Sequence, residues 1–472
     1  MATLEQALSI LDKLATELCN RQTDIEALDG AYRGDHKLTF ASEDFRDYFG
    51  SRYAKFSDNW CGIVADAPHE RLEVTGIRLK GDDNGDDDLW DSWRDNDADA
   101  FSDLAMLDAI ISKRAFALVW GTKDGDPRIT WEHPSQAIVS YDPETRARVA
   151  GAKIWCDDTH EFATLYLADE IWKFQRSRIQ SSLEIPAHLL EGGWESRAEG
   201  VIDNPLGKVP LVEMANRPRL IGEPVSDVSG VLSMQHAINL FWAQLFASAD
   251  EATLGQRVIL GAEMPTVPIL NADGVEIGTR PIDLKKFARD RALWLEDPAT
   301  KIAQWAPAKL DVFTSEIEVM VGHIAAQTRT PAHYLMIGGT IANVSGDAMK
   351  ALETGLVKRT EEKTQHFGRA IRDVFELVAL VKDDTAKAAA VRSGRVLWKD
   401  IENRSDAQRA DALAKKKEIG YPLRYLLELD GLSPTEIDRV MSMVRDEAVD
   451  PILANIVRSV QSEPSGNADL GA

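Results

Sequence analysis

Three histidines carry the most versatile chemistry in this chain. His133 lies in the sequence Trp-Glu-His-Pro-Ser-Gln, and His323 and His333 lie on either side of an Arg-Thr-Pro sequence that ends at Pro331. Two imidazoles at this separation can share a metal ion if the chain brings them together. Pro331 interrupts the helix predicted between them, so the two rings need not converge. We therefore favour a structural role for each histidine, and we predict no metal site and no catalytic residue.

The sequence contains none of the motifs that mark the common nucleotide-binding and hydrolytic enzymes. It lacks the Walker A loop of ATPases, a GxGxxG sequence after a strand, the GxSxG of serine hydrolases and the HExxH of zinc proteases. Acidic residues are abundant, but no pair of them has neighbours that indicate a general acid and a general base. We predict a protein that is not an enzyme, hydrolyses no ATP and needs no cofactor.

The acidic run from Gly81 to Asp88 is the other candidate for a metal site. Its sequence, Gly-Asp-Asp-Asn-Gly-Asp-Asp-Asp, is similar to loops in which carboxylates bind Ca²⁺. The run lacks the distal glutamate and the alternating ligands of an EF-hand loop. A solvated loop is the favoured interpretation, and Ca²⁺ binding is the alternative.

The three cysteines, Cys19, Cys61 and Cys156, are far apart and show no Cys-x-x-Cys spacing. A disulfide framework or a zinc site requires a paired arrangement of cysteines. We therefore predict buried free thiols in a reducing compartment.

The charge balance of the chain is strongly acidic. Its 472 residues carry a formal net charge of -23, and 44% of them are hydrophobic, which suffices for about three domains with sizeable cores. Proteins that bind DNA over a large surface are usually basic, because Lys and Arg neutralise phosphates. The acidity therefore indicates solubility, or a channel wall that repels DNA. The amphipathic N-terminus lacks the pattern of a signal peptide, and no apolar run predicts a membrane span.

Two basic clusters interrupt this acidity. One consists of Lys285, Lys286, Arg289 and Arg291, and the other runs from Lys415 to Lys417. The first cluster lies in a β-rich segment and is a candidate for contact with an acidic partner protein or with DNA. A solvated face is the alternative interpretation, and we favour it.

The first part of the chain predicts helices and then strands. Apolar residues recur at helical spacing over residues 3–29, and a strand at 71–80 precedes the acidic run. One helix is predicted from Trp90 to Ile111. Short segments rich in Val, Ile, Tyr and Trp over 115–176 predict an antiparallel meander, in which Asp142 begins a turn. Residues 204–220 are rich in proline and predict an extended connector.

The second part of the chain predicts long helices around a β-rich excursion. A first helix covers Ser226 to Asp250, and a second begins at Ser315, where Glu318 completes a capping box, and ends or bends at Pro331. A third and very long helix is predicted over 346–382, with apolar residues facing inward and a charged outer face. The segment between them, 337–345, is a flexible loop rich in glycine.

The remaining residues from about Lys399 predict further helices. Ser433, followed by Pro and Glu, has the pattern of a helix start. The final residues, Ser-Glu-Pro-Ser-Gly-Asn-Ala-Asp-Leu-Gly-Ala, have the composition of a disordered tail.

Four segments, taken in this order and spacing, resemble the bacteriophage portal proteins of the SPP1-like family, in particular those of actinobacteriophages. They are DNWCGIVADAPHERLEVTGIR at 58–78, HPSQAIVSYDPETR at 133–146, NPLGKVPLVEMANRPRL at 204–220 and HIAAQTRTPAHYL at 323–335. None of them is a catalytic motif. The resemblance covers nearly the whole chain and weakens beyond about residue 390.

The resemblance implies an α+β portal fold with wing, stem, clip and crown. The wing would contain an antiparallel β meander, and long helices would line a central channel. The implied boundaries are 1–225 for the wing, 226–252 and 309–332 for the two stem helices, 253–308 for the clip, 333–345 for the tunnel loop, 346–398 for a long wing helix and 399–472 for a crown with a disordered C-terminal tail.

The resemblance also implies a function and a set of partners. The chain would form a dodecameric ring at one vertex of the capsid, the conduit for packaging and ejection of double-stranded DNA. The tunnel loop would touch the DNA without reading its sequence, through Ile337, Gly338, Gly339, Thr340, Ile341, Asn343 and Ser345. Expected protein partners are the terminase large subunit, which would hydrolyse the ATP, a head-completion adaptor, the major capsid protein and the scaffold.

The implied location is the portal vertex of the virion, with a stage in the host cytoplasm during assembly, and no membrane is involved. Two alternatives from other classes remain. One is a different ring-forming protein of the virion neck, and the other is a soluble α+β enzyme in which His133 and the meander form a pocket. Assembly state and the presence of a pore distinguish them.

Overall fold

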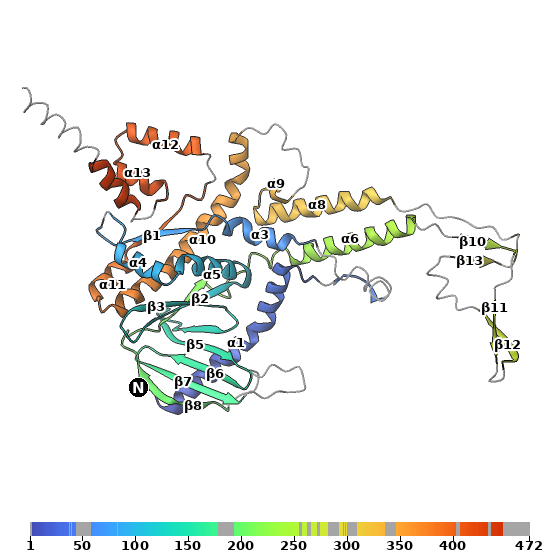
Figure 1. The fold of residues 1–472 in the computed structure, drawn as a ribbon, viewed down its shortest axis with the longest axis horizontal. Helices are drawn as coiled ribbons and strands as arrows, with labels where there is room; N and C mark the ends of the chain where they lie inside the picture. Colours follow the sequence, from blue (N-terminus) through green and yellow to red (C-terminus); the bar gives the residue numbers. More distant parts are fainter. Residues whose placement is uncertain are drawn as a thin grey trace, which may run out of the picture. The chain divides into compact units, whose positions relative to one another are not determined.

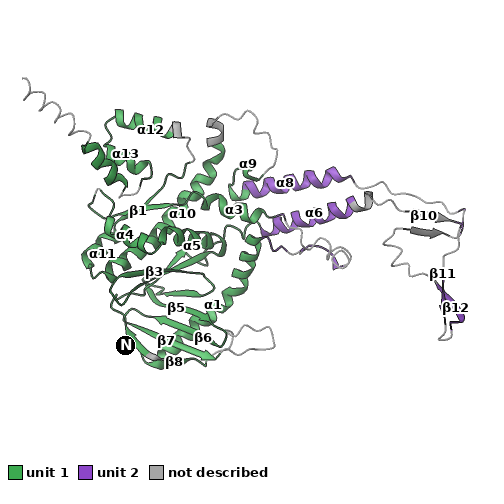
Figure 2. Cartoon of the chain, viewed as in Figure 1, with its two compact units in different colours: residues 1–33, 59–231, 327–472 green, residues 34–58, 232–326 purple. Residues whose placement is uncertain are grey.

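The computed structural model describes residues 2–36, 38, 40–43, 58–82, 84–177, 193–253, 257–261, 266–270, 274–281, 292–295, 297, 299, 309–335, 346–402, 406–432 and 436–446. The chain divides into two compact units, coloured green and purple in Figure 2. Unit 1 comprises residues 1–33, 59–231 and 327–472, and unit 2 comprises residues 34–58 and 232–326. Helices combine with mostly antiparallel sheets, which confirms the predicted α+β class.

A five-stranded antiparallel sheet forms one layer of unit 1 (Figure 1). Its strands, in order across the sheet, are β4 (Ala137–Tyr141), β5 (Arg148–Cys156), β6 (His160–Tyr166), β7 (Glu170–Ser177) and β8 (Glu195–Asp203). The helix α1 (Leu4–Arg33) covers one face of this sheet. Apolar residues at helical spacing on α1 pack against alternate residues of the strands. The helix contributes Leu11, Leu14 and Leu18, and the strands contribute Ala152, Leu165 and Phe174.

A second, three-stranded sheet corrects the prediction of a single meander. Its order is β3 (Pro127–Glu132), β2 (Arg114–Gly121) and β9 (Leu211–Ala215). The strand β9 lies in the segment predicted to be an extended connector, and it pairs with β2 over a long sequence separation. Gly151 allows the two sheets to approach closely, because a Cβ atom there would lie 3.2 Å from Leu211 and from Val209. Such long-range pairing leaves no local signal in the sequence.

The long helix α10 (Gly346–Val381) forms the centre of unit 1, as its apolar spacing predicts. Around it lie α3 (Trp60–His69), α4 (Asp87–Asp95) and α11 (Thr385–Arg392), and α5 (Ala98–Ser112) packs against α3 and α4. Trp93 of α4 stacks on Phe375 of α10 with ring centroids 5.0 Å apart. The single helix predicted from Trp90 to Ile111 is wrong, because Asp97 adopts a left-handed conformation, with φ of 49°, between α4 and α5.

The strand predicted at 71–80 is confirmed as β1 (Val74–Arg78), and it pairs with β14 (Arg395–Trp398) more than 300 positions away. After β14 the chain forms α12 (Asp406–Glu418) and α13 (Leu423–Leu429), and residues 436–446 are helical. The predicted helix start at Ser433 lies outside the described residues. The short helix α9 (Ala332–Leu335) follows Pro331.

The described residues of unit 2 form two long helices and four short strands. The helices are α6 (Leu232–Thr253) and α8 (Leu310–Thr328), and Phe241 and Phe313 join them edge to face, 6.2 Å between centroids. The strands β10 (Arg257–Leu260) and β13 (Ala292–Leu295) pair in parallel, and β11 (Thr266–Leu270) pairs with β12 (Glu276–Pro281) in antiparallel fashion.

Both helices of unit 2 begin elsewhere than their sequence signals predict. α6 begins at Leu232, because the hydroxyl of Ser226 accepts hydrogen bonds from the backbone N–H groups of Val228 and Ser229 and holds a turn there. α8 begins at Leu310, and the hydroxyl of Ser315 donates to the carbonyl of Asp311 inside the helix, so Ser315 is not its cap. Among the described residues, no helix is both long and apolar enough to cross a membrane.

The cysteines and the acidic run also differ in part from their predictions. All three cysteines are free, but Cys156 is exposed and only Cys19 and Cys61 are buried. Part of the acidic run holds helices and is not simply solvated: Asp86 caps α4, and Asp88 forms ion pairs with Lys382 and Lys387. The turn predicted at Asp142 is confirmed, since its carboxylate accepts the backbone N–H groups of Glu144 and Thr145.

His133 connects the strand region of unit 1 to two helices. Its Nε2 lies 3.3 Å from one carboxylate oxygen of Asp29 on α1. The other oxygen of Asp29 accepts a hydrogen bond from the hydroxyl of Ser112 at the end of α5. Burial alone would lower the pKa of His133, but the bond to Asp29 and the nearby charge of Asp108 raise it above its usual value. Folding therefore favours the protonated imidazole relative to the unfolded chain.

This raised pKa predicts a specific dependence of stability on pH. The stabilisation by His133 is fully present below about pH 6.5, the pKa of an unfolded-state histidine, and is lost as pH rises through the higher folded-state pKa. Measured by chemical denaturation, His133→Gln should cost about 1–2 kcal/mol at pH 5.5 and clearly less at pH 8.5. Asp29→Asn should reduce the same pH dependence. An equal cost of His133→Gln at both pH values would contradict the assignment.

Candidate functional site

Neither group of site residues predicted from the sequence falls within the described part of the chain. The loop 337–345, with Ile337, Gly338, Gly339, Thr340, Ile341, Asn343 and Ser345, lies outside it. The basic residues Lys285, Lys286, Arg289 and Arg291 also lie outside it. The structure instead describes the place where the chain leaves unit 1 before α6 and returns to it after α8.

A buried cluster of charges, which we call the root cluster, lies at this place. It consists of Asp227, Arg359 and Lys363. Asp227 follows Ser226 in the turn that precedes α6, and Arg359 and Lys363 are four residues apart on α10, so both project from one side of that helix. A single carboxylate oxygen of Asp227 lies 2.7 Å from Arg359 and 2.6 Å from Lys363.

Arg359 also holds the segment that returns after α8. Its guanidinium donates to the carbonyl of Thr328 at 2.8 Å, and the hydroxyl of Thr330 lies 3.4 Å away. A further bond of 2.9 Å reaches the carbonyl of Val64 on α3. The planar fork of arginine supplies donors in several directions, and here they join the outgoing and returning segments to one point of α10.

Lys363 connects the root cluster to Asn216. Its ammonium group donates to the side-chain oxygen of Asn216 at 2.6 Å, and the amide nitrogen of Asn216 donates to the carbonyl of Val225 at 2.8 Å. Asn216 is fully buried, and Lys363 is 1% exposed. The side chains of this cluster are therefore both buried and hydrogen-bonded, as burial of charge requires.

The electrostatics of the root cluster follow from its composition. Burial alone would raise the pKa of Asp227, but the positive charges of Lys363 and Arg359 outweigh burial and lower that pKa to about 2. Burial lowers the pKa of Lys363 to about 8 despite the nearby Asp227, and the charge of Arg359 acts in the same direction. At neutral pH the carboxylate stays ionised between two cations, an arrangement that joins α10 to the turn before α6.

The burial of Arg359 and Lys363 corrects the prediction that the charges of this helix lie on its outer face. A signal for their burial exists in the spacing. Leu356, Thr360, Lys363 and Phe367 follow one another at intervals of three and four residues, so Lys363 falls within the apolar stripe. The partner Asp227 is 132 positions from Arg359 and cannot be recognised from the sequence.

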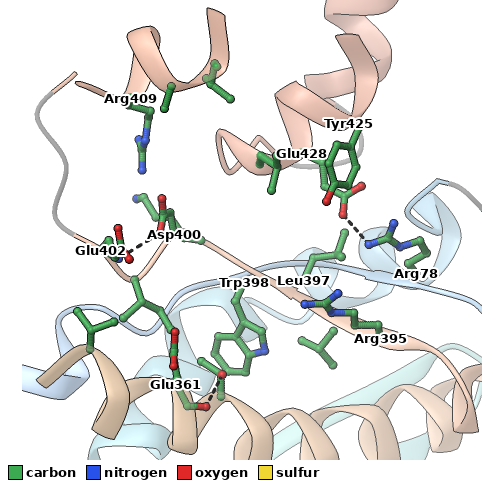
Figure 3. Close-up of a pocket in the computed structure, with 18 of the residues that line it drawn as sticks. Arg78, Glu361, Arg395, Leu397, Trp398, Asp400, Glu402, Arg409, Tyr425 and Glu428 are labelled. Carbon is green, nitrogen blue, oxygen red and sulfur yellow. Dashed lines mark hydrogen bonds and ion pairs between the residues drawn. The ribbon is translucent and has the colours of Figure 1, made fainter. Parts of the chain in front are cut away.

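A second feature of unit 1 is a cleft between β14 and the C-terminal helices (Figure 3). Its volume is about 650 Å³, and α10, β14, α12 and α13 contribute to its lining. Arg78 and Glu428 form an ion pair of 2.5 Å at its wall, and Arg409 of α12 lies across from Glu402 and Asp400. Among the described residues that line the cleft there is no histidine, cysteine or serine.

The other histidines of the sequence analysis are positioned as follows. His323 lies on the exposed side of α8, and His333 lies on α9, 3.8 Å from a carboxylate oxygen of Glu353. Within the described residues, no group of three or more His, Cys, Asp or Glu side chains could hold a metal ion.

The sequence of this chain matches the family described as "Phage portal protein, SPP1 Gp6-like" over residues 11–439. The chain belongs to this family of phage portal proteins. It is 28% identical over 375 residues to the portal protein of Mycobacterium phage D29 and 26% identical over 373 residues to that of Mycobacterium phage L5. Each match covers 75% of this chain and 71% of the relative. The resemblance to portal proteins is thus confirmed, and the family is a structural component of phages.

Two solved structures have a weak similarity to the fold of this chain. They are titled "Neck of native GTA particle computed with C12 symmetry" and "Neck of empty GTA particle computed with C6 symmetry". The similarities cover 84% of this chain and 95% of each other chain, with TM-scores of 0.41 and 0.40 and sequence identities of 11% and 12%.

The root cluster predicts a large effect of removing its only carboxylate. Asp227→Asn leaves Arg359 and Lys363 buried without their counter-charge, and breaking a buried pair in this way costs about 3–5 kcal/mol. Chemical denaturation of the variant should show this loss in the free energy of unfolding of unit 1. Asp158→Asn, which changes an exposed aspartate in the same way, is the matched control and should cost about 0.5 kcal/mol or less. Equal stabilities of the two variants would show that the root cluster is not a stabilising contact.

Proposed function

We propose that this chain forms a dodecameric portal ring at one vertex of a phage capsid. Double-stranded DNA would pass through the ring during packaging and ejection, in either case without recognition of base sequence. The observation that carries this proposal is the match to the portal family over residues 11–439, nearly the whole described chain. The resemblance of its four sequence segments, in order, supports the same assignment.

The charges of the two helices in unit 2 support a role in a conduit. Neither α6 nor α8 contains a lysine or an arginine. Acidic residues are present on both, namely Asp250, Glu251, Asp311, Glu316 and Glu318. Cations neutralise phosphates and hold DNA in place, so helices without cations suit a wall along which DNA must slide. We assign α6 and α8 to the stem and the short strands between them to the clip.

The other parts follow from this assignment. Residues before α6 would form the wing, the loop 337–345 would project into the channel as the tunnel loop, and residues 399–472 would form the crown. Gly338 and Gly339 would let the tunnel loop change conformation, because glycine adopts positive φ without strain. Ser345 would cap α10, which begins at Gly346.

Partners of such a ring can be assigned by part. The clip would dock the terminase large subunit during packaging and then a head-completion adaptor, and its cations Lys285, Lys286, Arg289 and Arg291 are candidates for contact with an acidic surface. The major capsid protein and the scaffold would surround the wing and crown during assembly in the host cytoplasm. ATP hydrolysis would belong to the terminase.

The ring is the first property to test. Electron microscopy of the purified full chain, with class averages and the mass in solution, should show rings of about a dozen subunits around an open centre. The diameter of that centre should exceed the width of a DNA duplex. A monomer or dimer that persists at high protein concentration would contradict the proposal and favour the soluble-enzyme alternative.

The tunnel loop gives a second test. Replacing residues 337–345 by a shorter linker should leave ring assembly intact, because the root cluster and the sheets are unchanged. Packaging or genome retention should fall, measured as the DNA content of heads assembled in the host with the variant portal. A shortened loop elsewhere in unit 1, such as residues 122–126 between β2 and β3, is a suitable control. Normal packaging and retention in the variant would show that the assignment of the tunnel loop is wrong.

A further inference from the structure

One loop of unit 1 holds two large apolar side chains almost entirely in water. Leu220 and Ile221, neighbours in the loop 217–224 that follows β9, are 84% and 90% exposed. Arg219, which directly precedes them, is exposed as well, and the chain on both sides of the loop belongs to the described residues. We call Arg219, Leu220 and Ile221 the loop tip. Adjacent apolar side chains left in water indicate a contact with another molecule.

The base of this loop is fixed by hydrogen bonds and an ion pair. The backbone N–H of Val225 donates to the carbonyl of Asn216 at 3.2 Å, and the side-chain amide of Asn216 donates to the carbonyl of Val225 at 2.8 Å. The carboxylate of Glu223 pairs with Arg114 of β2. Two prolines within the loop restrict its backbone further. A partner that binds the loop tip therefore finds it already positioned, and little conformational entropy is lost on binding.

A second surface of unit 1 is apolar and acidic. Phe101 and Leu104, three residues apart on α5, are 50% and 56% exposed, whereas the other side of this helix is buried in the core. Three exposed carboxylates lie close to them in the sequence, on Asp95, Asp97 and Asp99. We call these five residues the acidic ridge.

The loop tip and the acidic ridge are complementary in charge and in apolar character. Their four apolar side chains all remain exposed in a single chain, so the two surfaces do not cover each other within one copy. The ridge belongs to α4 and α5, and the loop tip follows β9 (Figure 1). A contact between two different patches of identical chains is heterologous, and such contacts form a ring when the rotation between copies closes.

We propose that the loop tip of one copy binds the acidic ridge of the next copy around the ring. This inference rests on the proposed ring-forming function and specifies two surfaces that join its subunits. Leu220 and Ile221 pack on the exposed apolar residues of α5, and Arg219 pairs with carboxylates of the ridge and sets the register between neighbours. A nucleic acid is a poorer occupant, because the carboxylates of the ridge repel phosphates.

The apolar part of the contact can be removed without harm to the fold. Leu220→Ser and Ile221→Ser, made together, change side chains that lie in water, so the melting temperature should stay within a few degrees of the wild type. The ring fraction, measured by native mass spectrometry and electron microscopy at equal concentration, should fall at least about tenfold. Ile419→Ser, which removes an apolar side chain that is 75% exposed between α12 and α13, is the control and should leave rings intact.

The charges allow a rescue experiment. Arg219→Glu places a carboxylate opposite the ridge, and Asp95→Lys with Asp99→Lys places cations opposite Arg219, so each change alone should lower the ring fraction. The triple variant restores opposite charges between copies and should recover rings. An equal mixture of the two kinds of chain gains only half of its contacts with opposite charges if neighbours assemble at random, so the triple variant is the decisive sample.

Cysteine cross-linking tests the pairing directly. Ile221→Cys and Leu104→Cys are combined in one chain that also carries Cys156→Ser, because Cys156 is the exposed native thiol and Cys19 and Cys61 are buried. Mild oxidation of assembled rings should link each copy to the next, which gives a ladder of oligomers on a denaturing, non-reducing gel. Leu104→Cys combined with Ile419→Cys in the same background is the control and should give no ladder.

The outcomes separate this inference from the proposed function. Absence of rings in the wild type would contradict the proposed function itself. Rings at the wild-type level in the Leu220→Ser and Ile221→Ser variant would overturn the inference, and if that variant also fails to enter heads, the loop tip binds a capsid protein instead. Rings that contain Ile221→Cys and Leu104→Cys but give no ladder on oxidation would overturn the pairing of loop tip with ridge.

Discussion

The burial of one carboxylate between two cations is the constraint on which unit 1 depends. Asp227, Arg359 and Lys363 must come together, because each of them alone would be an uncompensated charge in the protein interior. Meeting this requirement fixes the segment before α6 and the segment after α8 on the same part of α10. Directed hydrogen bonds to Asn216 and Thr328 then fix which residues of α10 face these two segments.

Regular spacing and local turn chemistry made much of the fold predictable. The spacing of the leucines in α1 and of the apolar residues in α10 predicts both helices. Pro331 follows the end of α8, and the carboxylate of Asp142 caps its turn, as their residue types predict. Helix starts were less predictable, since Ser226 and Ser315 both have the chemistry of a cap and the structure uses each for a different hydrogen bond. Contacts between distant positions were not predictable at all. The pairing of β1 with β14 and the burial of Arg359 both depend on residues more than 100 positions away.

The recognisable portal segments and the structurally important residues only partly coincide. The segment at 204–220 contains Asn216, which binds Lys363, and the segment at 323–335 contains Thr328 and Thr330, which bind Arg359. The family resemblance is thus carried partly by residues that bind the root cluster, although no local pattern in the sequence indicates that role. The residues predicted to touch DNA belong to the loop 337–345, which is outside the described residues, and rest on the resemblance alone.

The position of the root cluster along α10 has a mechanical consequence. An α-helix rises about 1.5 Å per residue, so Arg359 lies about 20 Å from the first residue of the helix, Gly346, and about 30 Å from its last. The far portion is clamped in the core by fully buried residues such as Phe367, Ile371 and Phe375. A pull on the near end therefore acts on a rigid arm with its fulcrum at Arg359. The load falls on the bonds to Asp227 and Thr328, the same bonds that hold the segment before α6 and the end of α8.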